Sequence, residues 1–309
     1  MTEFSVIIPL LNEQEVIPST YLKLKEIMDG LKSPYELIFI NDGSTDRSAS
    51  IIKEIAGRDA KIKLLSFSRN FGQEAAFSAG LEFASGRAVI FIDADLQDPP
   101  EVIPKMIEKW KQGYEIVYGR RLKREGESFF KRWSSDLFYR FLKRMSDHDI
   151  PVDVGYFRLI DRKVCEVIKG LREKSRFLRG LISWTGFRQA SVDYVRVKRK
   201  AGDTKYPLGR MIELSLAAVT SFSYKPLRIA TWLGFILSIM SFIYLLVVLF
   251  EKIFTSSTVS GWTSIIAINL FFNGVVLIIL GIIGEYIGRI YEEAKDRPLY
   301  IIADKTGFN

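Results

Sequence analysis

Short apolar runs alternate with helical patterns through the first third of the chain. The runs are almost continuous in apolar residues, as is typical of strands in a parallel sheet that is buried on both faces. They predict strands at 4–10, 35–41, 63–68, 87–93 and 115–119, with a further strand at 155–160. Helices are predicted at 13–31, 45–58, 73–84 and 100–111. The alternation of strands and helices indicates a doubly wound α/β domain.

Two longer apolar stretches, 229–250 and 263–284, contain no charged residue. Each would form a helix of about 33 Å, long enough to cross the hydrocarbon core of a membrane. Buried core helices are the alternative, but such helices carry a polar stripe and neither stretch has a wide one. Two transmembrane helices are therefore predicted. The preceding segment, 209–224, is apolar with few charges, which fits an amphipathic helix on the membrane or an ordinary packed helix.

Positive charge flanks both apolar stretches. Lys225 and Arg228 precede the first stretch, and Arg289, Lys295 and Arg297 follow the second. The loop between the stretches holds only one residue of each sign. The positive-inside rule therefore places both termini in the cytoplasm. The chain has a single cysteine, which agrees with a reducing compartment.

The composition leaves room for a well-packed domain beside the two stretches, because 48% of the 309 residues are hydrophobic and 26% are charged. The formal net charge is +8, and much of the excess lies in 120–144 and 196–210. Next to membrane helices, this excess favours anionic lipids and phosphates as ligands over nucleic acid. The lone histidine, His148, lies in a polar loop and is expected to be solvated.

The residues that follow the fourth strand are rich in oxygen ligands. Asp93, Asp95 and Gln97 recur at a spacing of two, so their oxygens project to one side if the strand geometry persists. In α/β sheets, ligands bind beyond the carboxyl ends of the strands. Mg²⁺ and Mn²⁺ prefer oxygen ligands in open, octahedral sites. The alternative is a structural turn, but the position after a buried strand favours a metal site that would neutralise a leaving diphosphate.

Polar residues also follow the second strand. Asp42 is placed to accept hydrogen bonds from a ribose or a base. Ser44, Thr45 and Asp46 come next, and we expect them to cap the following helix. The chain has no Ser-His-Asp set and no G-x-x-x-x-G-K-[ST] phosphate loop, which disfavours acyl transfer and P-loop chemistry.

Basic residues later in the chain are candidates for binding phosphate. Arginine's planar fork matches phosphate oxygens at two points, and lysine adds a point charge. A run of basic residues usually forms a solvated face. This interpretation is less attractive for Arg132, which lies beside Trp133, and for Arg199, which precedes a turn. The candidates are Arg120, Arg121, Arg132, Arg196, Arg199 and Lys205.

Four motifs, in this order, resemble those of the inverting glycosyltransferases of the GT-A fold, family 2. They are V-I-I-P-L-L-N-E at 6–13, N-D-G-S-T-D at 41–46, R-N-F-G at 69–72 and D-A-D-L-Q-D-P-P at 93–100. Over essentially the whole chain, the sequence is similar to polyprenyl-phosphate glycosyltransferases, above all to the bacterial and phage glucosyltransferases of the GtrB kind. The segment D-V-G-Y-F-R-L at 153–159 departs slightly from the family's Ser-Gly-Phe-Arg at Gly155 and Tyr156.

The resemblance implies an architecture and a location. A GT-A (Rossmann-like) nucleotide-sugar-binding domain is followed by an amphipathic juxtamembrane helix and two C-terminal transmembrane helices. The protein is expected in the bacterial inner membrane, with its catalytic domain in the cytoplasm. The expected parts are the catalytic domain at 1–208, the juxtamembrane segment at 209–227, the two spans with a short external loop at 228–285, and a cytoplasmic tail at 286–309.

By this resemblance, residues of the first hundred positions bind the donor and the metal. Asp93 lies near the ribose and the metal, while Asp95 and Gln97 ligate the ion, Mg²⁺ or Mn²⁺. The uridine end of the donor is held by Pro9, Glu13 and Asp42.

The same resemblance assigns the acceptor side. Asp153 either acts as a catalytic carboxylate or orients an arginine of the acceptor site. Arg199, Lys205 and Tyr206 look like the family's basic acceptor turn. The candidates for the lipid phosphate and the donor diphosphate are Arg120, Arg132, Arg199 and Lys205.

The implied reaction is the inverting transfer of a hexose, glucose from UDP-glucose, to undecaprenyl or another polyprenyl phosphate. The alternatives are the same reaction with mannose or aminoarabinose, and a noncatalytic module that binds nucleotide or lipid as a scaffold. The chain lacks the Q-x-x-R-W motif of processive relatives, so a single transfer is expected. The expected partners are the UDP-sugar, the lipid phosphate, the membrane, further copies in a homo-oligomer, and a flippase or downstream lipid-sugar transferase.

Overall fold

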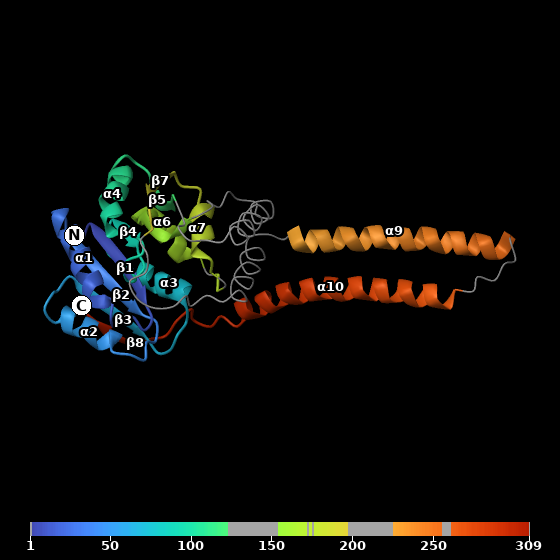
Figure 1. Ribbon diagram of the computed structural model, residues 1–309, viewed down its shortest axis with the longest axis horizontal. Coiled ribbons are helices and arrows are strands. Elements are labelled where there is room, and N and C mark those ends of the chain that lie inside the picture. Colours follow the sequence, from blue (N-terminus) through green and yellow to red (C-terminus); the bar gives the residue numbers. More distant parts are fainter. Residues whose placement is uncertain are drawn as a thin grey trace.

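The computed structural model describes residues 2–122, 154–171, 173–174, 176–196, 225–254 and 261–308. These residues form an α/β domain and a long helical hairpin that projects from it (Figure 1). Residues 225–227 of the predicted juxtamembrane segment belong to the first helix of this hairpin, whereas its residues 209–224 lie outside the described residues. The same holds for five candidate site residues, Arg132, Asp153, Arg199, Lys205 and Tyr206.

The core of the domain is an eight-stranded sheet with the order β7-β5-β6-β4-β1-β2-β3-β8. The neighbours β4, β1, β2 and β3 are parallel, as predicted, while β6 runs antiparallel to both β4 and β5, and β8 runs antiparallel to β3. Since β7 is parallel to β5, both point the same way as β4. The strands are β1 Phe4–Leu10, β2 Tyr35–Asn41, β3 Ile62–Phe67, β4 Ala88–Phe91, β5 Ile116–Arg121, β6 Val154–Asp161, β7 Gln189–Tyr194 and β8 Ile302–Thr306.

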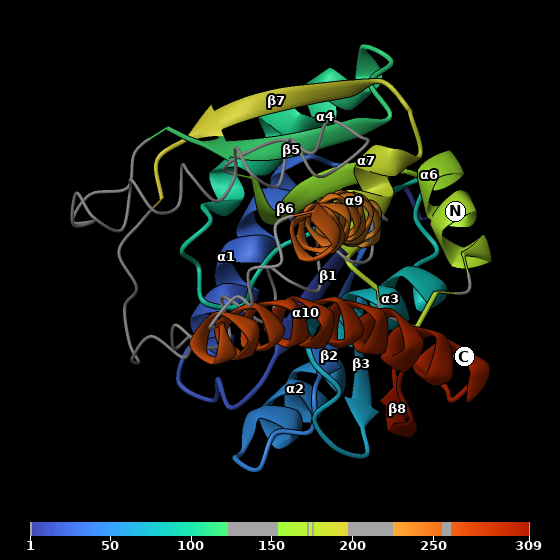
Figure 2. The same ribbon diagram turned by 90° about the vertical axis from the view of Figure 1, so that its right-hand side faces the viewer.

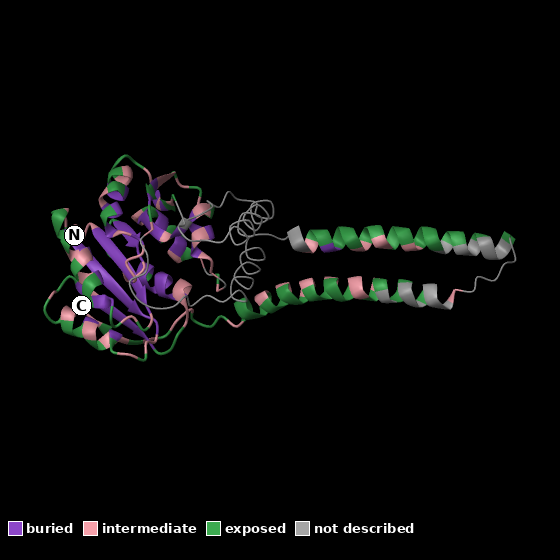
Figure 3. Ribbon diagram, viewed as in Figure 1, coloured by how far each residue is buried: buried purple, intermediate pink, exposed green. Residues whose placement is uncertain are grey.

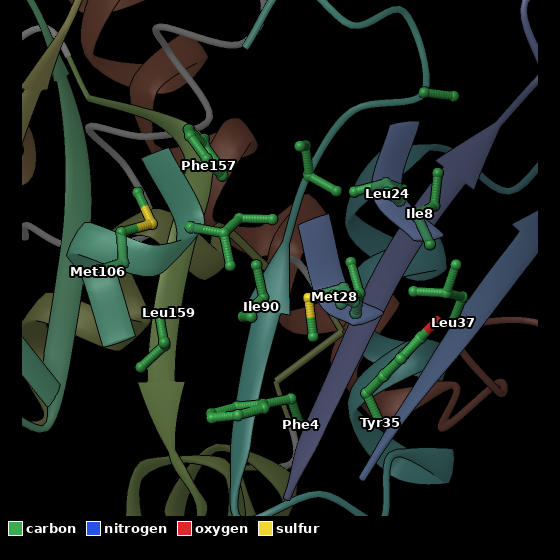
Figure 4. Packing of buried hydrophobic residues seen from close by; sticks show 14 of the residues in the cluster. Phe4, Ile8, Leu24, Met28, Tyr35, Leu37, Ile90, Met106, Phe157 and Leu159 are labelled. Carbon is green, nitrogen blue, oxygen red and sulfur yellow. The ribbon is translucent and has the colours of Figure 1, made fainter. Parts of the chain in front are cut away.

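Helices cover both faces of the sheet, and side chains that alternate along each strand supply both cores. In β1, Val6 and Ile8 belong to the cluster under α1, α2 and α4, whereas Ile7 packs under α3, α6 and α7. Figure 4 shows part of the first cluster. The helices are α1 Ile17–Gly30, α2 Ser48–Ala56, α3 Gln73–Phe83, the 3-10 turn η1 Pro100–Val102, α4 Ile103–Lys111, α6 Arg162–Gly170 and α7 Leu178–Trp184.

The hairpin consists of α9 (Lys225–Phe254) and α10 (Trp262–Ala294), which run side by side and contact each other (Figure 1). The predicted spans 229–250 and 263–284 lie inside these helices. By length and composition, the stretches Leu227–Tyr244 and Phe271–Ala294 could cross a membrane. Their apolar side chains are mostly exposed, in contrast to the buried interior of the α/β domain (Figure 3). Such exposure of apolar surface fits contact with lipid rather than water.

The chain returns from α10 to the sheet. Strand β8 pairs with β3 and closes the sheet edge opposite β7 (Figure 2). The Tyr300 ring stacks on Phe67 with the ring centroids 5.0 Å apart, and its hydroxyl donates to Glu82. The expected tail at 286–309 therefore contains the end of α10 and a strand of the catalytic domain. Both ends of the hairpin lie on the domain's side.

Candidate active site

The loops after β1 and β2 are joined by hydrogen bonds at the carboxyl edge of the sheet. The amide of Asn12 donates to Ser44 Oγ at 2.9 Å, and its side-chain oxygen accepts from the Thr45 amide at 2.9 Å. Asp46 accepts from the amide of Ser48, the first residue of α2, at 2.9 Å. Asp46 thus binds one free amide at the start of α2 from the position before the N-cap residue, Arg47, whose own side chain makes no capping bond, whereas Ser44 and Thr45 connect the two loops.

These connections explain why α1 begins later than the pattern predicts. The amide of Glu13 donates to Ser48 Oγ at 3.0 Å, and the amide of Gln14 donates to Asp46 at 3.1 Å. The first predicted turn of the helix is thus used to anchor the loop. Pro9 lies one residue before the end of β1, where it is paired with Ile40. Pro9 and Glu13 accordingly lie at the edge where a donor would bind, and their uridine contacts remain predictions.

Asp42 fixes the loop that follows β3. Its carboxylate, 5% exposed, accepts from the amides of Phe71 at 2.7 Å and Gly72 at 3.0 Å. The neighbouring Gly43 has a φ of 72°, and a Cβ there would lie 2.4 Å from the carbonyl carbon of Arg69. Glycine is needed where two backbones approach this closely. Asp42 thus shapes the R-N-F-G loop, and its predicted contact with ribose or base would use the remaining lone pairs.

The D-x-D segment does not continue the strand. Strand β4 ends at Phe91, so the expectation that strand geometry aligns the oxygens of the three residues is wrong. Leu96 adopts a φ of 55°, and the Gln97 amide donates to Asp95 Oδ1 at 3.1 Å, which makes a turn. Asp93 Oδ1 instead accepts from Gln73 Nε2, at the start of α3, at 2.8 Å. No pattern in the sequence indicated this contact.

Negative charge accumulates around Asp93. The protein packed around this residue raises its pKa to about 7, and the charges of Asp98 and Asp95 act in the same direction. Arg121 and Arg196 oppose the shift. A carboxylate with a raised pKa and specific charged neighbours is a common mark of a functional site. Asp93, Asp95 and Asp98 therefore form the electrostatic centre of the candidate active site.

Asp98 is the most buried of these carboxylates, with 1% of its side chain exposed. Tyr194 donates its hydroxyl proton to Asp98 Oδ1 at 2.5 Å. Arg121 Nη2 lies 3.4 Å from the same oxygen, and Arg196 Nε lies 3.7 Å from it. Among the described residues, no group donates a hydrogen bond to Asp98 Oδ2. The sequence placed Asp98 in the D-A-D-L-Q-D-P-P motif without indicating a role for it, and Tyr194 was missed because β7 was not predicted.

Two consecutive arginines at the end of β5 have different environments. Arg120 makes a two-point ion pair with Asp193 at 2.7 and 2.9 Å, and its side chain is 52% exposed. Arg121 is 15% exposed and points toward Asp98. A Cβ at Gly155 would lie 2.6 Å from Arg121 Nη2, so the glycine leaves room for this guanidinium. The structure thus directs Arg121, rather than Arg120, toward the carboxylates.

The departure from the family motif at Tyr156 also has a structural partner. The Tyr156 hydroxyl donates to Glu74, the second residue of α3, and Glu74 also accepts from the Leu178 amide at 3.0 Å. Arg179 lies over the Tyr156 ring, 4.5 Å from its centroid. Burial lowers the pKa of Arg158, on the same strand, to about 10, and Arg179 adds to this effect. This cluster joins α3, β6 and α7 beside the candidate active site.

The residues at this edge suit a divalent cation whose remaining coordination positions are filled by a substrate. Within the described ranges, no three His, Cys, Asp or Glu side chains form a complete metal site. Mg²⁺ commonly takes only one or two carboxylates and fills its other positions with water and substrate phosphates. Asp93 and Asp95 could supply those carboxylates, since their like charges already raise the pKa of Asp93. A cation would offset this repulsion.

Comparison with known proteins identifies the family. Residues 5–169 match the glycosyl transferase family 2 domain. The chain is a family 2 glycosyltransferase. Residues 225–290 of this glycosyltransferase match a second domain, the GtrB C-terminal hairpin, which corresponds to α9 and most of α10.

Several relatives of this glycosyltransferase match over nearly their full length. An uncharacterized glycosyltransferase, YkcC, of Bacillus subtilis (strain 168) is 55% identical over 99% of this chain and 94% of its own. A bactoprenol glucosyl transferase of Shigella phage SfV is 43% identical over 98% of this chain and 99% of its own. A prophage bactoprenol glucosyl transferase homolog of Escherichia coli (strain K12) is 42% identical over 97% of this chain and 98% of its own.

Among solved structures, the glycosyltransferase is similar to glucosyl-3-phosphoglycerate synthase from Mycobacterium tuberculosis. The similarity has a TM-score of 0.47 and 23% sequence identity, and it covers 71% of this chain and 79% of that one.

Proposed function

We propose that this glycosyltransferase moves a hexose, glucose from UDP-glucose, to polyprenyl phosphate with inversion at the anomeric carbon. One observation carries the proposal: the whole chain, domain and hairpin together, is similar to proteins named bactoprenol glucosyl transferase. Those relatives act, by their names, on a lipid carrier. The same sheet edge, with its carboxylates and arginines, suits a nucleotide-sugar diphosphate and a lipid phosphate. Mannose and aminoarabinose remain the alternative sugars.

The reaction needs little proton chemistry from the protein. The lipid phosphate oxygen is already anionic and attacks the anomeric carbon, while the bond to the nucleoside diphosphate breaks and its electron pair stays on the diphosphate. Positioning and electrostatic stabilisation therefore supply most of the rate. A bound Mg²⁺ or Mn²⁺ would neutralise the charge that develops on the diphosphate. Asp93 and Asp95, with Gln97 as the third proposed ligand, would hold that ion.

The proposed arrangement in the membrane follows from the hairpin. The end of α10 leads back into the α/β domain, because β8 pairs with β3, and the start of α9 lies at the same end of the hairpin (Figure 1). Together with the flanking positive charges, this supports a domain and two termini on the cytoplasmic side and a short loop outside. We propose the catalytic domain at 1–208 with its β8 supplied by the tail at 286–309, the juxtamembrane segment at 209–227 and the spans within 228–285. The lipid's phosphate would then lie beside the domain.

Product analysis tests the function. The purified full chain is incubated in vesicles containing undecaprenyl phosphate with Mg²⁺ or Mn²⁺ and one nucleotide sugar at a time, and the lipids are identified by mass spectrometry. We expect a glucosylated lipid phosphate with UDP-glucose. A product with another sugar would replace glucose in the proposal. The absence of any glycosylated lipid with the whole donor panel would overturn it.

The metal assignment has its own test. Changing Asp95→Asn keeps the shape of the side chain but removes a proposed ligand charge, so metal-dependent UDP release should fall at least about a hundredfold. The matched control is Glu166→Gln, which removes an exposed carboxylate on α6 and should leave the rate unchanged. Full-rate release by the Asp95→Asn protein would contradict the assignment.

A further inference from the structure

Asp98 is a buried carboxylate whose close donors all lie at one of its two oxygens. Three donors crowd one of its oxygens: Tyr194 at 2.5 Å, Arg121 at 3.4 Å and Arg196 at 3.7 Å. The other oxygen has no hydrogen-bond partner among the described residues, although the side chain is 1% exposed. A buried carboxylate is costly unless its lone pairs are satisfied. Two arginines therefore lie close to Asp98 without using all of their donors on it.

Strands β5 and β7 produce this convergence. The two strands are parallel and in register, with Arg120 opposite Asp193 and Arg121 opposite Tyr194. Because successive strand residues point to opposite faces, the first pair lies on the solvent side and the second lies on the side of the carboxylates. Arg121 Nε donates to the Tyr194 hydroxyl at 3.0 Å, and this hydroxyl donates in turn to Asp98. Tyr194 thus links the arginine to the acid.

The two arginines keep the capacity to bind another anion. A guanidinium group has five N–H donors. Arg121 uses one for Tyr194 and one for Asp98. Both arginines act electrostatically on Asp93, so they lie close to the carboxylates that we propose as metal ligands. An anion with several oxygens that bound beside Asp93 would meet two positive groups at once.

We propose that Asp98, acting with Tyr194, is a positioning residue that holds Arg121 and Arg196 beside Asp93, where the two guanidinium groups bind phosphate oxygens of a substrate. This inference rests on the proposed function for the identity of the substrates. The phosphate oxygens belong to the donor diphosphate or to the lipid phosphate. Asp98 does not touch the substrates; it fixes the direction of the arginines that bind the phosphate oxygens.

The first test compares isosteric changes on the two sides of the strand pair. Asp98→Asn removes the charge that attracts both arginines, and Tyr194→Phe removes the linking hydroxyl while keeping the ring that packs edge-to-face on Phe157. Asp193→Asn, which removes the exposed partner of Arg120, is the matched control. Loss of a partner that orients binding groups typically costs tenfold to a hundredfold in activity or affinity. We expect about this loss in kcat/KM for Asp98→Asn, a smaller loss for Tyr194→Phe, and no change for Asp193→Asn.

Separate titrations of the two substrates identify the phosphate. A KM that rises only for UDP-sugar assigns the arginines to the donor diphosphate, and a KM that rises only for vesicle-borne undecaprenyl phosphate assigns them to the lipid. The Kd of UDP, measured by calorimetry with the full chain, reports donor binding without turnover. Unchanged KM values for both substrates in Asp98→Asn and Tyr194→Phe would overturn the inference.

A double-mutant cycle separates positioning from general structural support. If Asp98 acts through Arg121, the two residues belong to one network and the effects of changing them should not add. In a protein that already carries Arg121→Ala, adding Asp98→Asn should then lower kcat/KM by less than about threefold. Fully additive losses would show that Asp98 acts otherwise and would overturn the inference. If Asp98→Asn fails to fold, the same cycle is run with Tyr194→Phe. If the wild-type chain transfers no sugar to lipid, the proposed function fails. The Kd of UDP in the variants then still tests whether the two arginines bind a nucleoside diphosphate.

Discussion

The two ends of the central sheet each contain an acidic residue surrounded by protein, and the two residues have opposite properties. At the amino end, Glu36 is 3% exposed and accepts hydrogen bonds from Ser5 at 2.5 Å and from the Ser85 amide and hydroxyl at 2.8 Å each. Lys63 completes the set with an ion pair at 2.7 Å. Burial raises the pKa of Glu36, but these partners outweigh it and hold the pKa below its usual value.

At the carboxyl end, the balance is reversed. The surrounding protein raises the pKa of Asp93, and the neighbouring acids Asp98 and Asp95 add to the shift. The charge of Glu36 is balanced by Lys63 and by three hydrogen-bond donors, whereas Asp93 lies in a cluster of acids that an added cation would stabilise. The difference indicates where a ligand would bind: an acid balanced by a neighbouring cation supports the fold, whereas an acid among like charges is typical of a functional site.

The largest expected effect is on catalysis at the carboxyl end. Asp93→Asn removes one of three neighbouring acids, so sugar transfer should fall at least about a hundredfold. The metal-free variant should unfold at the same temperature as the wild type or higher, because like-charge repulsion is relieved. Turnover assays and thermal unfolding with and without Mg²⁺ and UDP check both parts. If the variant lost its activity because it no longer folded, the proposed contrast between the two ends of the sheet would be contradicted.

A moderate effect is expected at the amino end. Glu36→Gln breaks the ion pair with Lys63 and leaves an amide among donors, which costs about 2 kcal/mol of folding free energy. For a domain of this size, the unfolding midpoint should fall by about 4–8 °C. At temperatures where it is folded, the Glu36→Gln protein should keep the wild-type KM for both substrates. An altered KM at unchanged stability would mean that Glu36 is not a structural residue.

The smallest effect is a pH dependence. Because the folded-state pKa of Glu36 is depressed, its contribution to stability is fully present above the usual value of 4.5 and is lost as the pH falls through the folded-state pKa. The difference in unfolding midpoint between the wild type and Glu36→Gln should therefore shrink below about pH 4.5. Thermal unfolding at a series of pH values measures it. A difference that stayed constant down to pH 3 would argue against the depressed pKa.

The sequence predicted the central strands well because their signal is local. Strands β1 and β2 have the predicted bounds, since long apolar runs buried on both faces leave little ambiguity. Strands β7 and β8 were missed: both mix polar and apolar residues, and each pairs along one edge of the sheet with a strand far away in sequence. Their pairing depends on tertiary contacts that no short window contains.

The candidate site was predictable in its location but only in part in its contacts. The motifs after β1, β2 and β4 indicated the carboxyl edge, and the family resemblance indicated which residues matter. The distinction between Arg120 and Arg121 could not be predicted, because it depends on the register with β7 and on the space at Gly155. Likewise, the contact of Gln73 with Asp93 depends on how the turn after β4 meets α3.

Strand β8 has a consequence for how the protein is made. Its partner β3 lies near the start of the chain, but β8 itself follows both apolar helices in sequence. During translation, the sheet stays open at the β3 edge until the whole hairpin has left the ribosome. The sheet of the catalytic domain is therefore completed only after the segment that would anchor the protein has already emerged.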